Sequence, residues 1–257
     1  MMKFLGYILI IQLLRQGTAG SINRNGRIVG GERAEAGFAP YQVSLQDEWN
    51  SHKCGGAILN SDWIITAGHC VTKKLPEDVL IIAGTNRWEE PGTIYYVKQI
   101  HMHCNYDIPY MHNDIALLQV NESIVFNQLI QPVDLPTRPL REGDEIVLTG
   151  WGSDAPYDEP LDNLQKLAVG FVPHEECLAI FNNTANLGVG HVCTFSRTGE
   201  GACHGDSGGP LISNGSLVGI VNWGRPCAVG LPDVQASVYY YLDWIRRAIT
   251  GNSKCIF

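Results

Sequence analysis

The sequence predicts an all-β protein, and three observations support that class. From Tyr41 onward the 257-residue chain alternates short apolar runs with polar turns, which is the pattern of many short strands. Asn214 and Gly215 separate two such runs, and Asn-Gly is a favoured pair in tight hairpin turns. Hydrophobic residues form 45% of the chain, which is enough for a substantial core in one large β domain or two small ones.

The first residues predict a secretory signal peptide. A basic residue precedes a largely apolar stretch over residues 4–14, and small residues at 17–20 follow it, so we expect cleavage near Ala19 or Gly20. That stretch is too short to span a membrane, and no later one reaches about 18 apolar residues. We therefore expect a signal peptide at 1–20 and a secreted, extracellular protein with no membrane partner.

The net charge and the cysteines limit the classes of partner and the cellular compartment that we expect. The chain carries a net charge of −8, and its first 27 residues hold four basic residues and no acidic one, so the remainder carries −12. Such an acidic excess argues against nucleic acid and anionic membranes as partners. Eight cysteines without any Cys-x-x-Cys pair predict disulfides formed in an oxidising compartment rather than a zinc site.

Strands are expected wherever a short apolar run lies between turn residues. In the first half of the chain the candidates are residues 41–45, 57–67, 79–83, 94–103 and 115–120. In the second half they are residues 146–151, 164–172, 191–194, 210–212, 217–223 and 234–238. Residues 131–143 contain polar and proline breaks and form the expected linker. Apolar residues recur at helical spacing over 239–250, which predicts a C-terminal helix.

One serine in a glycine-rich stretch is the candidate nucleophile. Residues 199–210 place Ser207 among small neighbours, which allow positive φ and close approach of the backbone. The N–H groups of Gly205 and Ser207 could then point at one anion, as an oxyanion hole requires. A serine also needs a base and a group that orients it, and the candidates are His69 and Asp114. For Ser207 alone, a glycine-rich surface loop is the alternative interpretation.

With these residues in place, the sequence resembles the chymotrypsin-like serine proteases of the trypsin fold, and its pattern resembles arthropod digestive chymotrypsins. The resemblance rests on five blocks in order: I-V-G-G at 28–31, T-A-G-H-C at 66–70, D-I-A-L at 114–117, G-D-S-G-G-P at 205–210 and N-W-G at 222–224. It implies two six-stranded antiparallel Greek-key barrels with a C-terminal helix, and a site in the cleft between the barrels.

The resemblance also implies a role for each site residue. Ser207 would be the nucleophile, His69 the general base and Asp114 the group that orients His69, with the oxyanion held by the N–H groups of Gly205 and Ser207. The family usually has Ser where Asn222 stands, and that Ser contacts the catalytic Asp. An Asn can still donate to Asp114, and its backbone should pair with an extended substrate.

Substrate selection follows from the implied pocket. The pocket floor lies six residues before the nucleophile, where Asp would select Arg and Lys, but this chain has Gly201 followed by Ala202. Beside Trp223, Gly224 leaves the mouth open to a large side chain, and Asp233 places a carboxylate on one wall. We expect cleavage after Phe, Tyr and Leu, with secondary cleavage after Arg or Lys. Alternatively, a local hydrogen-bond network holds Asp233 and it has no effect on selection.

Activation is expected at the bond between Arg27 and Ile28, which ends a polar pro-segment at 21–27 and begins a protease domain at 28–257. By the resemblance, a trypsin-like protease frees the α-amino group of Ile28, which then pairs with Asp206 and orders the oxyanion hole. A buried carboxylate without a partner costs several kcal/mol, so the ion pair has a physical purpose.

The resemblance pairs the cysteines as well. It implies bridges Cys54–Cys70, Cys177–Cys193 and Cys203–Cys227. Cys104 and Cys255 remain, and we expect them to form a bridge because the family places the C-terminal helix beside the segment before Asp114.

No cofactor or metal site is expected. His101 and His103 alternate on one strand with Cys104 and His112 nearby, but no further ligand in register completes a tetrahedral site. Thr85 stands where the family's calcium loop would have an acid. His204 is expected to line the substrate rim.

The implied function is that of a secreted, monomeric, digestive endopeptidase of chymotrypsin-like specificity that is made as a zymogen. Its expected partners are protein or peptide substrates, a trypsin-like activator and protein protease inhibitors. The alternatives are a trypsin-like or cascade protease with one narrow target, or a non-catalytic binding protein of the same fold. A non-catalytic relative usually lacks one triad residue, whereas this chain has all three. N-glycosylation sequons begin at Asn121, Asn182 and Asn214.

Overall fold

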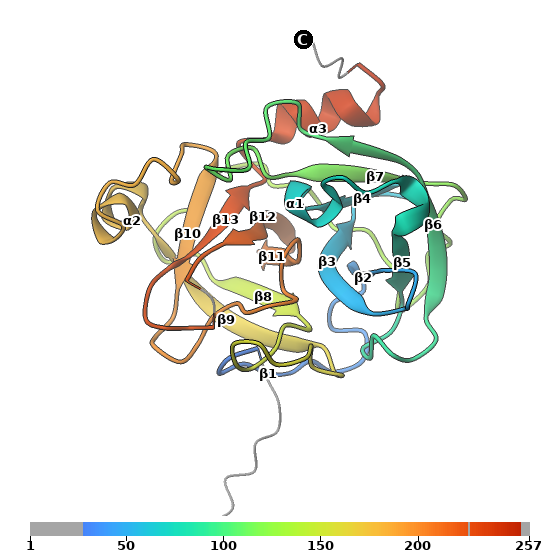
Figure 1. Cartoon of the computed structure of the whole chain (residues 1–257), viewed down its shortest axis with the longest axis horizontal. Coiled ribbons are helices and arrows are strands. Elements are labelled where there is room, and N and C mark those ends of the chain that lie inside the picture. The colour runs from blue at the N-terminus through green and yellow to red at the C-terminus, as the bar shows by residue number, and fades with distance from the viewer. Residues whose placement is uncertain (1–27, 226, 253–257) are drawn as a thin grey trace, which may run out of the picture.

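The computed structural model describes residues 28–225 and 227–252, which form two β-barrels side by side (Figure 1). The first barrel closes in the order β2-β3-β4-β7-β6-β5. Its strands are β2 (Gln42–Gln46), β3 (His52–Ile58), β4 (Trp63–Thr66), β5 (Leu80–Ala83), β6 (Thr93–Met102) and β7 (Ala116–Val120). All neighbours in this ring are antiparallel.

The second barrel closes in the order β8-β9-β10-β13-β12-β11, because β11 and β9 both pair with β8. Its strands are β8 (Ile146–Gly150), β9 (Gln165–Val172), β10 (His191–Phe195), β11 (Pro210–Ser213), β12 (Ser216–Trp223) and β13 (Asp233–Ser237). A two-residue strand, β1 (Glu32–Arg33), adds to the outer edge of β9. The two antiparallel six-stranded barrels confirm the expected fold class.

Each barrel has its own core, and a third cluster joins them. The joining cluster includes Ile65 and Leu117 of the first barrel, Ile220 of the second, and Ile245 of α3 (Leu242–Ile249). The C-terminal helix is therefore present, although it begins at Leu242 rather than at 239. Because this apolar interface is continuous, each barrel buries part of its surface against the other.

The structure corrects one strand and adds three short helices. Residues 57–67 are not one strand: they span the end of β3, a turn and β4. Asn60 Oδ1 accepts the N–H of Asp62 at 2.9 Å, and the Leu59 N–H donates to the Trp63 carbonyl at 2.9 Å, so local hydrogen bonds make a hairpin. The unexpected helices are α1 (Gly68–Val71), η1 (Pro76–Asp78) and α2 (His174–Ile180).

Three of the predicted disulfides are formed. Cys54–Cys70 links β3 to α1, Cys177–Cys193 links α2 to β10, and Cys203–Cys227 links the segment before Ser207 to the segment before β13. Cys104 is also disulfide-bonded. Because Cys255 lies outside the described residues, the Cys104–Cys255 pairing stays a prediction.

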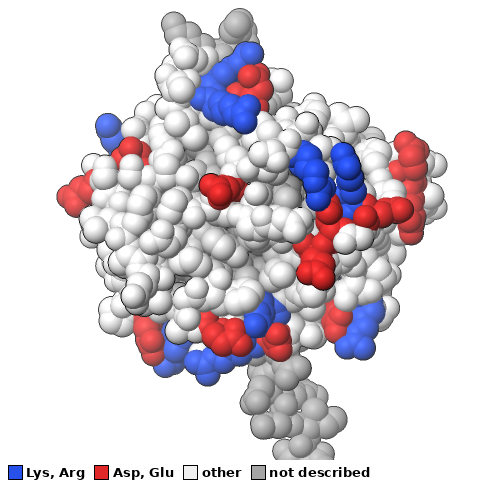
Figure 2. Space-filling view, turned by 180° about the vertical axis from the view of Figure 1, so that it is seen from behind, with Lys and Arg blue, Asp and Glu red and all other residues white. Residues whose placement is uncertain are grey.

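The surface is mixed in charge. On the face opposite to that of Figure 1, basic and acidic side chains alternate around the margin and much of the centre is uncharged (Figure 2). Several basic groups are engaged locally; Lys166, for example, lies 2.8 Å from Glu35. Within the described residues, no helix is both long and apolar enough to cross a bilayer.

Candidate active site

His69 and Asp114 are paired in a geometry that fixes the histidine tautomer. His69 lies in α1, directly after β4, and Asp114 precedes β7 by two residues. Asp114 is fully buried and accepts the His69 backbone N–H at 2.6 Å and the ring Nδ1 at 2.6 Å. An ionised carboxylate only accepts, so Nδ1 carries the proton and Nε2 is left as the basic nitrogen.

The strand that anchors His69 also holds Ser207. The Gly55 N–H in β3 donates to the Ser207 carbonyl at 2.8 Å. The neighbouring residue, Cys54, is disulfide-bonded to Cys70, which directly follows His69. Two adjacent residues of one strand thereby bring together two segments that are far apart in the sequence.

The turn after Ser207 requires glycine. Gly208 has φ 74°, and a Cβ there would meet the Thr66 hydroxyl and, at 2.7 Å, the Gly55 carbonyl oxygen. Any side chain would therefore push the turn away from β3 and β4. The small neighbours of Ser207 permit the close approach that the sequence analysis expected.

Two backbone N–H groups in the turn that carries the candidate nucleophile have no hydrogen-bond partner among the described residues. Within the described residues, the backbone N–H groups of Gly205 and Ser207 donate to no protein acceptor, whereas the Asp206 N–H between them bonds the Cys203 carbonyl at 3.1 Å. Gly205 has φ 98°, a conformation that suits glycine. These are the two donors expected for an oxyanion.

His52 supports this turn, although no pattern in the sequence marks it. Its Nε2 donates to the Gly205 carbonyl at 2.8 Å, and its Nδ1 lies 2.8 Å from Ser44 Oγ. Burial lowers the pKa of His52 to about 4, so the imidazole is neutral and Nδ1 accepts from the hydroxyl. A lone histidine in a strand belongs to no motif, so only the fold reveals this role.

Asp206 is a fully buried carboxylate against glycine backbone. Its Oδ1 accepts the Gly152 N–H at 2.8 Å and its Oδ2 accepts the Cys203 N–H at 2.9 Å. A Cβ on Gly150 or on Gly152 would collide with the carboxylate oxygens. Burial raises the pKa of Asp206 to about 7, because two neutral donors do not fully replace water around a charge.

The start of the described chain packs into the same barrel. Ile28 is fully buried in the second-barrel core with Ala202, and the Val29 carbonyl accepts the Gly201 N–H at 3.1 Å. Arg27 lies outside the described residues. Cleavage there, and the ion pair between Ile28 and Asp206, stay predictions.

A cavity of about 180 Å³ opens beside Ser207. Its lining comprises Ala202, Cys203, His204, Ser207, Val221, Asn222, Trp223, Gly224 and Asp233. The candidate nucleophile therefore lies at a pocket formed by β12, β13 and the segment before Ser207. His204 lines it as expected, and its ring stacks on the exposed ring of Tyr157 with centroids 6.1 Å apart.

Asp233 lies closer to the pocket floor than the one-wall position expected from the sequence. Its Oδ2 accepts the Ala202 N–H at 2.8 Å, and a Cβ on Gly201 would lie 2.8 Å from the same oxygen. Its Oδ1 would lie 3.0 Å from a Cβ on Gly224. The carboxylate thus lies between the floor and the mouth, where both glycines leave it room. Burial raises the pKa of Asp233 to about 7. The hydrogen bond from Ala202 acts in the opposite direction, and the nearby charge of Asp206 adds to the increase.

Asn222 does not contact Asp114, so that expectation is wrong. Its Nδ2 lies 3.3 Å from the Met111 carbonyl and 3.2 Å from His191 Nε2. Asn222 lies where the register between β12 and β13 shifts, and its side chain is longer than that of Ser. Its amide therefore reaches the turn before Asp114 instead of the carboxylate. His191 was not anticipated as a site residue.

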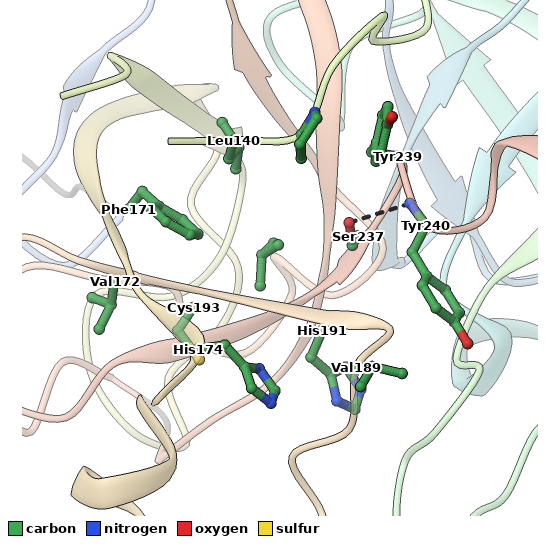
Figure 3. Close-up of a pocket in the computed structure, with 12 residues that line it drawn as sticks. Leu140, Phe171, Val172, His174, Val189, His191, Cys193, Ser237, Tyr239 and Tyr240 are labelled. Carbon is green, nitrogen blue, oxygen red and sulfur yellow. Dashed lines mark hydrogen bonds between the residues drawn. The ribbon is translucent and has the colours of Figure 1, made fainter. Parts of the chain in front are cut away.

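A second, larger and mostly apolar cavity of about 530 Å³ is shown in Figure 3. Leu140, Phe171 and Val172 line one part of it, and His191 and Tyr240 line another. It contains none of the three candidate catalytic residues. We therefore assign the chemistry to the smaller cavity.

One group of described residues has atoms close enough together to suggest a metal site: Cys54, His69 and Cys70. The two cysteines are joined in a disulfide, so neither offers a thiolate. The group therefore does not suit a metal ion.

Comparison with known proteins agrees with this geometry. The model of the trypsin family matches residues 28–245. Chymotrypsin-2 of Vespa crabro is 41% identical over 221 residues, which cover 86% of this chain and 99% of the relative. Trypsin 5G1 of Aedes aegypti is 34% identical, covering 88% of this chain and 86% of the relative, and Serine protease 1 of Homo sapiens is 32% identical, covering 96% and 99%. From the two barrels, the paired His and Asp, the serine at the pocket and these matches, it follows that the chain belongs to the trypsin family and is a serine endopeptidase.

Proposed function

We propose that this endopeptidase uses Ser207, His69 and Asp114 as a catalytic triad and cleaves after large apolar residues. The observation that supports this most directly is the short bond from His69 Nδ1 to the buried Asp114, beside a pocket lined by Ser207. The proton on Nδ1 leaves Nε2 free to accept the Ser207 hydroxyl proton as Oγ attacks the scissile carbonyl.

The remaining steps use the same groups. The N–H groups of Gly205 and Ser207 hold the oxyanion, and His69 returns the proton to the leaving amine. Water then hydrolyses the acyl-enzyme with His69 again as base. Asp114 orients the ring and stabilises its cation, which it can do because it is itself held by two bonds from His69.

Ser207→Ala tests this assignment. It removes the nucleophile and should lower kcat by roughly 10⁶ while leaving substrate binding largely intact. A matched control is Ser123→Ala, because the Ser123 hydroxyl donates to Asp62 at the protein surface and neither residue is a candidate site residue. Retention of substantial turnover in Ser207→Ala would show that the assignment is wrong.

We further propose chymotrypsin-like selection. Gly201 leaves the floor without a side chain and Gly224 leaves the mouth open, so a large apolar side chain fits between them. Asp233 adds a carboxylate that a basic side chain can reach, which supports secondary cleavage after Arg or Lys. A P1 substrate library distinguishes this from trypsin-like selection, which would appear as strict cleavage after Arg and Lys.

We also propose a secreted, digestive enzyme made as a zymogen, with a trypsin-like activator and protein protease inhibitors as partners. The apolar N-terminal stretch, Arg27-Ile28 and the buried Asp206 support this. The uncleaved precursor should be nearly inactive, and trypsin cleavage after Arg27 should activate it. Asp206→Asn should leave the cleaved protein folded but weakly active. Full activity of the uncleaved protein would exclude the zymogen proposal.

The Vespa relative is named a chymotrypsin and the Aedes relative a trypsin, so their names alone do not settle the selection. A cascade protease with one narrow target is the other candidate. Titration of the activated protein with an active-site serine reagent gives the concentration of working sites. A broad substrate profile per titrated site supports the digestive role, and a single preferred sequence supports the cascade role.

A further inference from the structure

The turn that leads into Asp114 is strained. Met111 and Asn113 both have φ 55°, which non-glycine residues rarely adopt. Such conformations cost about 1–3 kcal/mol each and persist only where the surroundings over-determine them. Asp114 follows directly, so whatever holds this turn also sets the position of the carboxylate.

The second barrel supplies two donors to this turn, both directed at the Met111 carbonyl. His191 Nε2, from β10, lies 3.1 Å from that oxygen, and Asn222 Nδ2, from β12, lies 3.3 Å from it. The Gly188 N–H donates to His191 Nδ1 at 3.0 Å, so the neutral ring carries its proton on Nε2. Since a carbonyl oxygen has two lone pairs, it can accept from both side chains.

Both donors are buried, and one of them is incompletely satisfied. His191 and Asn222 are each 4% exposed, and Asn222 Oδ1 is a buried acceptor without a partner among the described residues. Leaving such an acceptor unpaired costs about 1–3 kcal/mol, so the amide is retained there at the expense of stability. His191 also packs edge-on against Trp223, with ring centroids 6.2 Å apart, and lines the apolar cavity of Figure 3.

We propose that His191 and Asn222 are positioning residues that together clamp the Met111 carbonyl, and that this clamp holds Asp114 in register with His69. The Tyr241 hydroxyl, which donates to Asn113 Oδ1 at 3.3 Å, supports the same turn. The inference rests on the proposed triad. It means that the second barrel, which contributes Ser207, also aligns the carboxylate contributed by the first.

Two variants remove one donor each with little change in volume: His191→Phe and Asn222→Leu. Each should lower kcat by roughly 10- to 100-fold with KM nearly unchanged, since misplacement by about 1 Å of a catalytic group can cost this much. The double variant should lose less than the product of the two single effects, because both donors act on one carbonyl. The matched control is His174→Phe: His174 lines the same cavity but makes no bond to the turn, so kcat should not change.

A spectroscopic readout separates positioning from general destabilisation. The proton in the 2.6 Å bond between His69 Nδ1 and Asp114 should resonate far downfield in the NMR spectrum. In His191→Phe and Asn222→Leu this resonance should shift or broaden, and it should stay in place in His174→Phe. If either variant fails to fold, the other carries the test.

The outcomes distinguish this inference from the proposed function. If wild-type Ser207 does not react with a serine reagent, the triad assignment fails first. If Ser207 reacts, but the single variants keep wild-type kcat per titrated site and the His69 resonance does not move, the clamp is refuted. A lower melting temperature with unchanged kcat likewise assigns the two residues to stability alone.

Discussion

At the scale of single residues, Asp233 gives the pocket two chemical states near neutral pH. Burial raises the pKa of this carboxyl to about 7, so it is neutral below that pH and anionic above it. The neutral form offers a large apolar P1 side chain a pocket without charge. The anion offers a basic side chain a partner that is poorly hydrated and therefore effective.

The first prediction follows from this titration. The ratio of kcat/KM for matched Arg and Phe substrates should rise as pH increases through about 7, because Asp233 gains its charge there. In Asp233→Gly and in the isosteric Asp233→Asn, the ratio should be lower at pH 8 and nearly independent of pH. If the ratio is the same in wild type and both variants, Asp233 is confined to its hydrogen bond with Ala202 and does not select substrates.

The proposed site residues could be picked out from the sequence where a motif marks them. Ser207, His69 and Asp114 stand in blocks that require those residue types, and the structure places His69 on Asp114. Asn222 was placed on the wrong partner, because sequence does not show that its longer side chain finds the Met111 carbonyl. No sequence pattern marks His191, since its proposed role depends on a turn that folding brings beside it.

At the scale of elements, the turn between Ser207 and β11 depends on contact with the first barrel. Gly208 has positive φ and a Cβ there would meet β3 and β4, whereas Gly215, also at positive φ, has open space around it. An alanine at Gly215 therefore carries only the cost of the backbone conformation, whereas an alanine at Gly208 carries that cost and the cost of the collision.

The second prediction compares Gly208→Ala with Gly215→Ala. Gly215→Ala should cost about 1–2 kcal/mol of unfolding free energy, the cost of a left-handed L-residue, with kcat unchanged. Gly208→Ala should cost more and should also lower kcat sharply, because the collision displaces Ser207. Urea unfolding and active-site titration measure the two effects. Equal stability loss with intact kcat would mean that the turn adjusts without moving the nucleophile.

Most of the strands were predictable, because short apolar runs between polar turns mark antiparallel strands clearly in the sequence. The error over 57–67 arose from a turn of Asn60, Ser61 and Asp62 inside an apolar run, where local side-chain bonds reverse the chain. The short helices α1 and α2 were missed because four and seven residues are too few to show a helical period.

At the scale of the whole molecule, the proposed activation makes Asp206 a link between cleavage after Arg27 and stability. Burial raises its pKa from 3.8 to about 7 in the uncleaved chain. Between those values the folded precursor holds a proton that the unfolded chain has released, so folding is favoured at low pH. That stabilisation is present below about 4 and is lost as pH rises through about 7.

The third prediction is that cleavage after Arg27 should stabilise the protein more at pH 8 than at pH 5. A new α-amino cation beside Asp206 would stabilise the charged carboxylate and remove the penalty. The measurement is the difference in melting temperature between cleaved and uncleaved Ser207→Ala protein, which cannot digest itself. In Asp206→Asn this difference should lose its pH dependence, and a difference independent of pH in the parent would contradict the coupling.

The linker has a consequence for how long the enzyme survives its own activity. Its backbone is hydrogen-bonded to both halves of the chain. The Gln131 N–H donates to the Pro40 carbonyl and the Val133 N–H to the Ile58 carbonyl, each at 2.9 Å. The Asp134 carbonyl accepts the Leu217 N–H at 2.8 Å. A second enzyme molecule cannot bind this segment as an extended substrate unless those hydrogen bonds are first broken.

Tyr157, by contrast, is 95% exposed in the loop between β8 and β9, and it has a side chain that the proposed pocket would accept. Self-digestion in concentrated solution should therefore begin after Tyr157 and spare the linker, and mass spectrometry of ageing samples would show which bond breaks first. Tyr157→Ser should prolong the working life of the enzyme without altering kcat on small substrates. The resistance of this protease to self-digestion would then depend on one surface loop.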